Sequence, residues 1–379
     1  MEKTKKTVVV AMSGGVDSSV AALLLHNQGF NVIGVTMRLF PQSEESNYSL
    51  NKSCCSLDDV EDARSVCRQI NSKHYYLNFE KEFNEHVVQY FISEYQKGRT
   101  PFPCLACNDR LKFDFLLKRA EFMKADYIAT GHYANIAKNE NIYTLEKGAD
   151  ETKDQSYVLF NLTQEIMKKF KLPVGKYPKI KIREIAEEYG LINAKKPDSQ
   201  DICFIPDGDY KKFINKKISE KEGVIINSEG KKLGNHKGIH NFTIGQRKGL
   251  GIESNGKPLF VTKIYPSNNT VEVGPPNELL QKKAFISRLN IISGQGIDDK
   301  KSIYAKIRYK STPAKGKIEL KGNGDAIFVF DEPQRAITPG QALVFYHDNQ
   351  VVGGGFIEYE ETVTEICLLY TSPSPRDRG

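Results

Sequence analysis

Short hydrophobic runs and amphipathic segments alternate through the first third of the chain, and this alternation is the strongest constraint on its fold. The predicted strands are residues 7–12, 31–37, 74–79 and 127–130. The predicted helices are residues 18–26 and 58–70, with two more that start near Phe83 and Arg110. Repeated strand–helix units favour a parallel sheet covered by helices, with ligands at the carboxyl ends of the strands. The first domain is therefore expected to be α/β.

The character of the chain changes near residue 206, where Gly, Asn and Lys become frequent and short strands replace helices. Six further strands are predicted at residues 284–292, 302–310, 315–320, 326–330, 342–347 and 350–357. Closely spaced short strands of this kind are typical of an antiparallel barrel or sandwich. The predicted domains are an α/β domain over 1–205, a small central domain over 206–281 and a C-terminal antiparallel β-barrel over 282–365. The central domain is expected to act as a linker and to contact a polyanionic partner.

The last residues, CLLYTSPSPRDRG, break the preceding strand pattern. We predict that residues 366–379 are a non-native, disordered tail and that the natural sequence ends or diverges near Thr364. The sequence has neither a signal core nor an apolar run of membrane-spanning length, which predicts a cytoplasmic protein. Its seven cysteines are accordingly expected to be thiols, and its formal charge of +7 modestly favours a polyanionic partner.

The segment AMSGGVDSS, residues 11–19, joins a hydrophobic strand to a helix. Gly14 and Gly15 permit a tight turn, the helix start attracts an anion, and Asp17 offers a carboxylate for Mg²⁺. The segment lacks the lysine of the GxxxxGK[ST] loop, which argues against γ-phosphoryl transfer. SGGVDSS resembles the PP-loop of ATP pyrophosphatases, and this resemblance implies cleavage of ATP between the α and β phosphates and adenylation of an oxygen.

Two cysteine segments are candidates for thiol chemistry. Cys104 and Cys107 stand three apart in a proline-stiffened loop that opens a helix, and Cys203 lies far along the chain. Helix amides and three nearby basic residues are expected to lower a thiol pKa and so favour the thiolate. The basic residues are Arg99, Arg110 and Lys112. In one interpretation, one of these cysteines carries a persulfide sulfur and a second cysteine releases that sulfur by forming a disulfide with the first. A zinc site would need a fourth close ligand, and an iron–sulfur cluster on the three cysteines is the other alternative.

Several longer strings resemble the tRNA-specific 2-thiouridylases, in order and over nearly the whole chain before the tail. They include AMSGGVDSSVAALLL, GRTPFPCLACN, ADYIATGHYA, KDQSYVLF, KPDSQDICFIPDGDY, FTIGQRKGLG and RYKSTPA. The resemblance implies an ATP site at Ala11, Met12, Ser13, Gly14, Gly15, Val16, Asp17, Ser18, Met37 and Gly131. It implies a nucleophile at Cys107, a persulfide carrier at Cys203 and target-base contacts at Phe102, Pro103 and Cys104. The implied tRNA contacts are His132, Lys153, Asp154, Gln155, Arg308, Tyr309 and Gln341.

The same resemblance implies the substrates: the wobble uridine of Lys, Glu and Gln tRNAs, with sulfur from a cysteine desulfurase through relay proteins. One position departs from the family pattern, because Phe102 replaces the usual Asn, and an aromatic ring cannot donate the amide hydrogen bonds. Two basic stretches, residues 168–183 and 300–317, contain no acid and are predicted to hold the tRNA backbone.

The predicted function is therefore tRNA 2-thiolation, in which the C2 carbonyl of uridine is adenylated with ATP and then receives sulfur from a persulfide. Two alternatives remain open from sequence. An amidating synthetase with the same ATP loop would need neither Cys107 nor Cys203. A non-catalytic RNA-binding protein would bind tRNA without ATP turnover.

Overall fold

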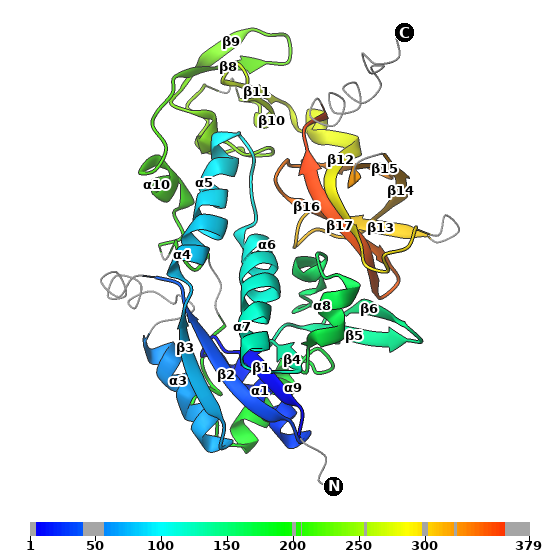
Figure 1. The fold of residues 1–379 in the computed structure, drawn as a ribbon. Helices are drawn as coiled ribbons and strands as arrows, with labels where there is room; N and C mark the ends of the chain where they lie inside the picture. The colour runs from blue at the N-terminus through cyan, green and yellow to red at the C-terminus, as the bar shows by residue number, and fades with distance from the viewer. Residues whose placement is uncertain are drawn as a thin grey trace, which may run out of the picture.

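The computed structural model describes residues 5–40, 57–198, 202–205, 207–253, 256–297, 302–321 and 324–360. These residues form three sheets, and helices accompany the first (Figure 1). The predicted tail at 366–379 and the loop cysteines Cys54 and Cys55 lie outside the described residues.

The first sheet has five parallel strands in the order β3-β2-β1-β4-β7. The strands are β1 (Thr7–Ala11), β2 (Asn31–Arg38), β3 (Lys73–Asn78), β4 (Tyr127–Ala129) and β7 (Phe170–Lys171). Val8 and Val10 face a core that includes Val20, Ala63 and Ile182, contributed by α1 (Val16–Asn27), α3 (Leu57–Gln69) and α9 (Lys179–Glu188). Val9 faces the opposite core, with Phe113 and Leu116. Both faces are thus covered, which confirms the predicted α/β class.

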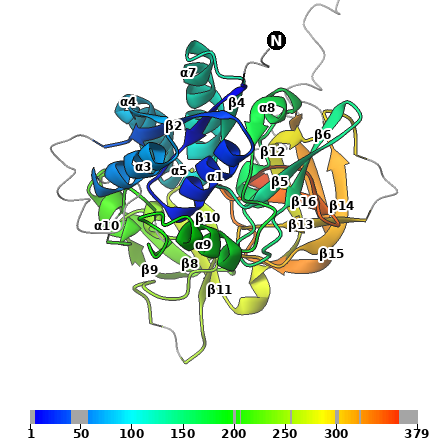
Figure 2. The same ribbon diagram turned by 90° about the horizontal axis from the view of Figure 1, so that it is seen from below.

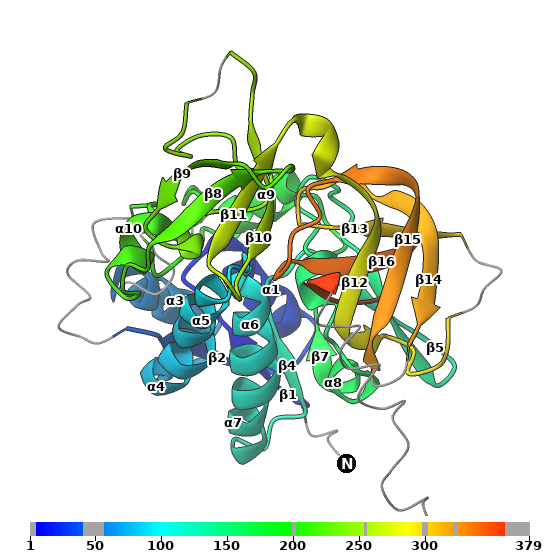
Figure 3. The same cartoon turned by 90° about the horizontal axis from the view of Figure 1, so that it is seen from above.

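A small central sheet follows the first domain, after α10 (Tyr210–Asn215). Its order is β10-β11-β8-β9, formed by β8 (Gly223–Asn227), β9 (Lys232–His236), β10 (Phe260–Tyr265) and β11 (Thr270–Gly274). Ile225, Val261, Val271 and Val273 are fully buried and form the centre of its own hydrophobic cluster. Figure 1 shows this sheet at the top of the molecule, beyond the end of α5, whereas the first sheet lies at the bottom, and Figures 2 and 3 show it beside the barrel.

The third sheet closes into the predicted antiparallel barrel, because its first strand pairs with its last. Its strands are β12 (Leu280–Ile291), β13 (Ile303–Lys306), β14 (Ala314–Leu320), β15 (Ala326–Arg335), β16 (Ala342–His347) and β17 (Gln350–Glu358). Phe328, Phe330 and Phe345 fill the interior, with the rings of Phe328 and Phe345 stacked at 5.5 Å. Because the barrel is closed, few strand edges remain unpaired, and unpaired edges are the sites at which sheets of different molecules associate.

Three details differ from the sequence-based expectation. The predicted strand at 302–310 ends at Lys306, because the hydroxyl of Ser311 accepts the amides of Ile307 and Arg308 and turns the chain. The two long helices begin at Glu80 and Pro103 rather than near Phe83 and Arg110. Each consists of consecutive segments: α4 (Glu80–Phe83), η1 (Asn84–Val88) and α5 (Gln89–Gln96), then α6 (Pro103–Ala106), η2 (Cys107–Leu116) and α7 (Leu117–Phe122).

The third difference is a hairpin that the sequence analysis missed. Strands β5 (Ala134–Asn139) and β6 (Ile142–Lys147) follow the α/β domain's fourth strand but join the sheet of the barrel. Strand β6 pairs with β17 at Glu146 to Gln350 and Leu145 to Val351. The first domain and the barrel are therefore joined through a continuous ladder of hydrogen bonds.

Candidate active site

The turn between β1 and α1 is built around glycine and serine. The Ser18 hydroxyl donates to the Gly15 carbonyl over 3.0 Å and accepts the Ser13 amide over 3.3 Å. Gly14 has φ of 72°, and a Cβ there would lie 2.4 Å from the carbonyl oxygen of Asp59. Only glycine fits such a position. The turn has the backbone form that a phosphate cradle at a helix start needs.

The other residues predicted to bind nucleotide lie at neighbouring strand ends. Met37 stands near the carboxyl end of β2 and Gly131 just beyond β4, and these two strands flank β1. A Cβ on Gly131 would lie 2.6 Å from the Ser18 amide nitrogen, so the two loops are in direct contact. The structure brings the predicted ATP residues, 11–18, Met37 and Gly131, to one edge of the sheet.

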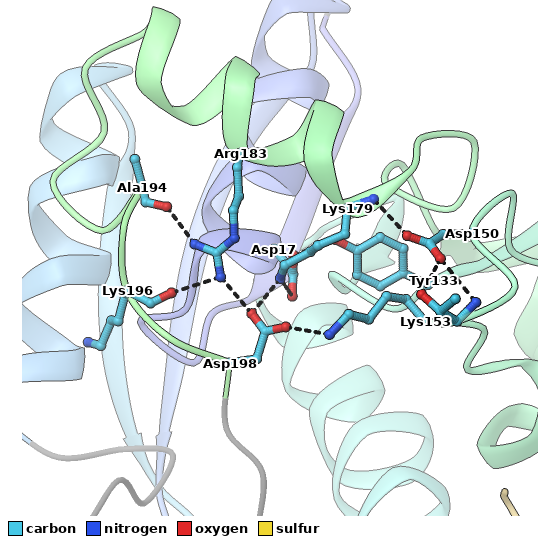
Figure 4. Close-up of polar contacts among 10 residues, drawn as sticks. Asp17, Tyr133, Asp150, Lys153, Lys179, Arg183, Ala194, Lys196 and Asp198 are labelled. Atoms are coloured by element: carbon cyan, nitrogen blue, oxygen red, sulfur yellow. Dashed lines mark hydrogen bonds and ion pairs between the residues drawn. The ribbon is translucent and has the colours of Figure 1, made fainter.

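A chain of ion pairs runs from Asp17 to Asp198 (Figure 4). The Lys179 ammonium contacts the two Asp17 oxygens at 2.7 and 2.8 Å and Asp198 at 2.7 Å. The Tyr133 hydroxyl donates to Asp17 over 2.6 Å. Asp198 also accepts Lys153 at 2.8 Å and Arg183 at 3.0 Å. Burial disfavours ionisation of Asp198, but hydrogen bonds from Lys153 and Lys179 outweigh it and lower the pKa of its carboxyl.

Further contacts tie residues 193–198 to the glycine turn. The Asn193 side-chain amide donates to the Gly14 carbonyl over 2.9 Å and to the Ser19 hydroxyl over 2.8 Å. Lys196 pairs with Asp59 at 2.7 Å, beside Gly14. The segment that leads towards Cys203 is thus fastened to the loop at several points. Sequence reasoning missed Tyr133, Lys179 and Asn193, because their partners lie more than a hundred positions away in the chain.

The two principal thiols border one apolar cluster. Cys107 is the first residue of η2 and is half-buried, and Cys203 is half-buried beside the buried Phe204. Both pack against the cluster that contains Met37. A π-helical segment such as η2 is frequent at functional sites. Three predicted site residues from distant parts of the chain, Met37, Cys107 and Cys203, therefore belong to or border the same apolar cluster.

The remaining cysteines differ in their surroundings. Cys104 is exposed in α6, three residues before Cys107. Cys67 is fully buried against Met12, and burial raises the pKa of its thiol to about 11. A thiol of such high pKa is an inert core residue at neutral pH.

The basic residues expected beside the thiols have other partners. Arg99 is buried between Glu94 and Glu358, so its charge is already compensated. Arg110 approaches its neighbour Asp109 at 3.8 Å. Lys112 Nζ donates to the side-chain amide oxygen Oδ1 of Asn108 over 2.8 Å and lies 3.4 Å from His132 Nε2. Two carboxylates thus compensate the Arg99 charge, and the lowering of a thiol pKa by these three cations stays a prediction.

His132 lies in the interior. Its Nδ1 lies 2.6 Å from the Thr130 hydroxyl, and burial, together with the nearby Lys112 ammonium, places its pKa well below the usual value. The imidazole is neutral at pH 7 and cannot attract a phosphate by charge.

Most of the other predicted tRNA contacts make internal hydrogen bonds. The Asp154 carboxylate is buried and accepts the amides of Gly148 and Ser156 at 3.0 and 3.1 Å. The Tyr309 hydroxyl donates to the Asp154 carbonyl at 3.0 Å. Similar contacts hold Gln155 to the Tyr133 amide, Gln341 to the Thr100 carbonyl, Arg308 to the Ala336 carbonyl and Lys153 to Asp198. Two of these contacts, Tyr309 to Asp154 and Gln341 to Thr100, join the barrel to the first domain.

Phe102 belongs to a group of three aromatic rings. Its centroid lies 6.0 Å from that of Tyr309 and 6.4 Å from that of Tyr157. Pro103 is buried at the first turn of α6. The Phe102 ring, which replaces the usual Asn of the family, thus packs near two other aromatic rings shortly before Cys104.

The two basic stretches are less open to RNA than their composition suggested. In residues 168–183, Lys169 pairs with Glu121, Lys179 with Asp17 and Arg183 with Asp198. In the second stretch, burial lowers the pKa of Lys306. The acids that pair with Lys169, Lys179 and Arg183 lie outside the stretch, so a charge count within it cannot reveal them.

The described part of the chain contains neither a metal-binding group nor a membrane-spanning helix. No three Cys, His, Asp or Glu side chains gather there as a metal-binding group, Cys104, Cys107 and Cys203 included. No helix in the same residues is long and apolar enough to cross a bilayer. Asp17 already accepts three hydrogen bonds of the roughly four that a carboxylate can take. Its oxygens are thus largely occupied by Lys179 and Tyr133, and about one further position is open to a Mg²⁺ ion.

Comparison with known proteins agrees with this architecture. Residues 6–207 match the family described as tRNA methyl transferase HUP domain, 211–275 its PRC-barrel domain, and 281–357 the aminomethyltransferase beta-barrel domain. The tRNA-specific 2-thiouridylase MnmA of Clostridioides difficile strain 630 is 48% identical over 357 residues, 93% of this chain and 98% of that protein. The protein of the same name from Acetivibrio thermocellus is 47% identical over 94% of this chain and 100% of its own length. The chain belongs to the tRNA-specific 2-thiouridylase family.

Proposed function

We propose that this protein is an ATP-dependent tRNA sulfurtransferase that converts a wobble uridine into 2-thiouridine, with AMP and pyrophosphate as the other products. The observation that carries the proposal is that Cys107 and Cys203 pack against one apolar cluster with Met37, which lies at the sheet edge that holds the glycine turn. A nucleotide loop and two thiols are the groups that adenylation followed by sulfur transfer requires.

The first step activates the uridine. The C2 oxygen attacks the α-phosphorus of ATP, pyrophosphate leaves, and the base carries AMP on that oxygen. The glycine turn and the amides of α1 hold the phosphates, while Gly131 keeps the two loops in contact. Asp17 would contribute to a Mg²⁺ site, and the ion would neutralise phosphate charge. Since AMP is a far better leaving group than hydroxide, the substitution at C2 becomes feasible.

The second step transfers sulfur. The terminal sulfur of a Cys203 persulfide attacks C2, AMP departs with the former carbonyl oxygen, and a disulfide links Cys203 to the base. The Cys107 thiolate then attacks the Cys203 sulfur, which leaves the terminal sulfur on C2 and forms a Cys107–Cys203 disulfide. An external dithiol must reduce this disulfide before the next turnover.

The wider context of the proposal comes from the family. The substrates are the Lys, Glu and Gln tRNAs, and a cysteine desulfurase or a sulfur-relay protein charges Cys203. The reaction takes place in the cytoplasm. Phe102, Pro103 and Cys104 lie beside the target base, with the Phe102 ring in place of an amide.

The test measures tRNA-dependent AMP release and 2-thiouridine in the same reactions. Wild-type protein should give both products. Cys203→Ala should form no 2-thiouridine from a persulfide donor. Cys107→Ala should stop with the tRNA base linked to Cys203 by a disulfide, so that no free 2-thiouridine is released. Cys67→Ala is the matched control, since that thiol is buried in the core.

Several results would contradict the proposal. Thiolation by either Cys107→Ala or Cys203→Ala at the wild-type rate would remove the assigned roles. AMP release with incorporation of ammonia would indicate an amidating synthetase, and tRNA binding without AMP release would indicate a non-catalytic RNA-binding protein. Stoichiometric iron in the anaerobically purified protein would favour the cluster mechanism.

A further inference from the structure

A cavity of about 590 Å³ lies where the α/β domain meets the central domain, and the reaction above makes no use of it. Its walls come from the end of α5, the start of α10 and the loop before β10. The lining includes Tyr95, Tyr210, Lys211, Thr243, Arg247 and Lys248. Three of these side chains are cationic, and none of the described residues that line the cavity is acidic.

The loop before β10 is constructed to present two of these cations. It contains the FTIGQRKGLG string, in which Phe242, Ile244 and Leu250 are buried in the central core. The Gln246 side chain accepts the Thr243 amide at 3.1 Å and donates to the Lys248 carbonyl at 3.0 Å, which closes the turn. Arg247 and Lys248 are exposed, and neither forms an ion pair within the described chain. The buried apolar side chains and Gln246 thus fix the loop so that the Arg247 and Lys248 charges, which have no acidic partner among the described residues, lie at the cavity.

The opposite wall is aromatic. The rings of Tyr95 and Tyr210 are stacked, with centroids 5.4 Å apart and an interplanar angle of 27°. Tyr95 is buried beneath, whereas Tyr210 is half-buried and lines the cavity. A supported aromatic ring beside cations is the usual platform for a nucleobase next to its phosphate.

The cavity is also connected to the loop that carries the thiols. Thr100 lines it, and the Thr100 hydroxyl donates to the Thr243 hydroxyl over 3.2 Å. Thr100 stands four residues before Cys104, so even an extended chain keeps the two Cα atoms within about 14 Å. Stacked nucleotides advance by about 3.4 Å each along one strand. A strand bound in the cavity can therefore reach Cys104 within a few nucleotides.

We infer that this cavity binds the tRNA nucleotides that flank the target uridine, with Lys211, Arg247 and Lys248 on the phosphates and Tyr210 against a base. The inference rests on the proposed function for the identity of the RNA. It assigns to the FTIGQRKGLG loop a role in RNA grip that is separate from ATP binding and from sulfur transfer.

The experiment compares Arg247→Ala/Lys248→Ala with Lys231→Ala/Lys232→Ala. The control pair removes the same charge from the same domain, at exposed positions of the β8–β9 turn. Binding of a fluorescent tRNA transcript is measured by anisotropy over a series of KCl concentrations. Each lost phosphate contact reduces the slope of log Kd against log salt by about 0.7–0.9. The cavity variant should lose about 1.5 from the slope and bind tRNA at least tenfold more weakly at physiological salt, whereas the control should match wild type.

A second pair of variants tests the aromatic wall. Tyr210→Phe should bind tRNA as wild type does, and Tyr210→Ala should bind several-fold more weakly with an unchanged salt slope, because stacking releases no counterions.

An unchanged salt slope in the cavity variant would overturn the inference. A raised KM for ATP with normal tRNA affinity would instead make the cavity a nucleotide site, and a defect confined to sulfur delivery would make it a docking site for the donor protein. The two proposals fail separately. If wild type binds tRNA but forms no 2-thiouridine, the proposed function fails, while a reduced slope in the variant still supports the RNA site.

Discussion

Arg99 and Glu358 stand 259 positions apart in the chain and form a two-pronged buried ion pair, with nitrogen–oxygen distances of 2.6 and 2.7 Å. Arg99 also contacts Glu94 at 2.8 Å. Around this pair, the Thr100 amide donates to the Pro339 carbonyl and the Tyr359 hydroxyl to the Gly98 carbonyl, both at 2.8 Å. The loop that leads to Cys104 is thus held by the last strand of the barrel.

Breaking this pair should affect stability and catalysis together. Glu358→Gln leaves the Arg99 charge buried with one carboxylate fewer, so the free energy of unfolding should fall by about 2 kcal/mol. Turnover for thiolation should also fall, since the thiol loop loses its anchor. Urea unfolding and 2-thiouridine formation are the measurements. Glu319→Gln, which removes an exposed pair with Lys321, is the control and should cost less than about 0.5 kcal/mol. Equal effects of the two variants would contradict this prediction.

Lys179 joins the nucleotide loop to the segment before Cys203, and its loss should impair ATP use. Lys179→Met leaves the carboxylates of Asp17 and Asp198 without the cation between them. We expect kcat/KM for ATP to fall at least about tenfold, equivalent to about 1.4 kcal/mol. AMP release at varied ATP concentration measures this. Lys169→Met removes only a surface pair with Glu121 and should leave the ATP dependence unchanged.

Gly131 should tolerate no side chain. An added Cβ would lie 2.6 Å from the Ser18 amide nitrogen and 2.7 Å from the Asp17 carbonyl carbon, so Gly131→Ala must push the two loops apart. KM for ATP should rise by tenfold or more, with tRNA affinity retained. Gly296→Ala, where an added Cβ meets nothing within 4 Å, is the control. A wild-type KM in Gly131→Ala would show that the loops separate without cost.

His74 makes the fold sensitive to mild acid. Burial lowers its pKa to about 4, while the unfolded chain has a histidine pKa near 6.5. Between these values the unfolded state binds more protons, so this contribution to stability is complete above pH 6.5 and is lost as the pH falls towards 4. His74→Gln, which keeps a partner for the Thr36 hydroxyl, should flatten the decline in unfolding free energy from pH 7 to 5. An equally steep decline in His74→Gln and in wild type would contradict this prediction.

The elements with strong periodicity were predictable, and those that depend on distant partners were not. Residues 7–12 became β1 because the valines had to be buried on both faces, and residues 58–70 became α3 with Val60, Ala63 and Cys67 inside. The strand predicted through Arg308 stopped early because one serine hydroxyl captured two amides. The β5–β6 hairpin was missed because its pairing partner is the last strand of the barrel, about two hundred residues later.

The candidate site shows the same division. SGGVDSS is a local signal, since its glycines must adopt special backbone angles, and its turn could be expected from the sequence. Lys179 lay within a stretch predicted to hold RNA, yet it serves Asp17, because only the folded chain places the two together. Gln341, which is predicted to contact tRNA, donates to the Thr100 carbonyl, a partner that no local pattern could indicate.

The hairpin of Ala134–Asn139 and Ile142–Lys147 has a consequence for biosynthesis. Its partner, β17, follows about two hundred residues later, so the outer edge of the hairpin stays open until those residues have been translated. An expressed fragment that stops before Gln350 would keep this edge unpaired and should associate with itself. The enzyme cannot be shortened from its carboxyl end to an autonomous ATP-binding unit without first capping that hairpin.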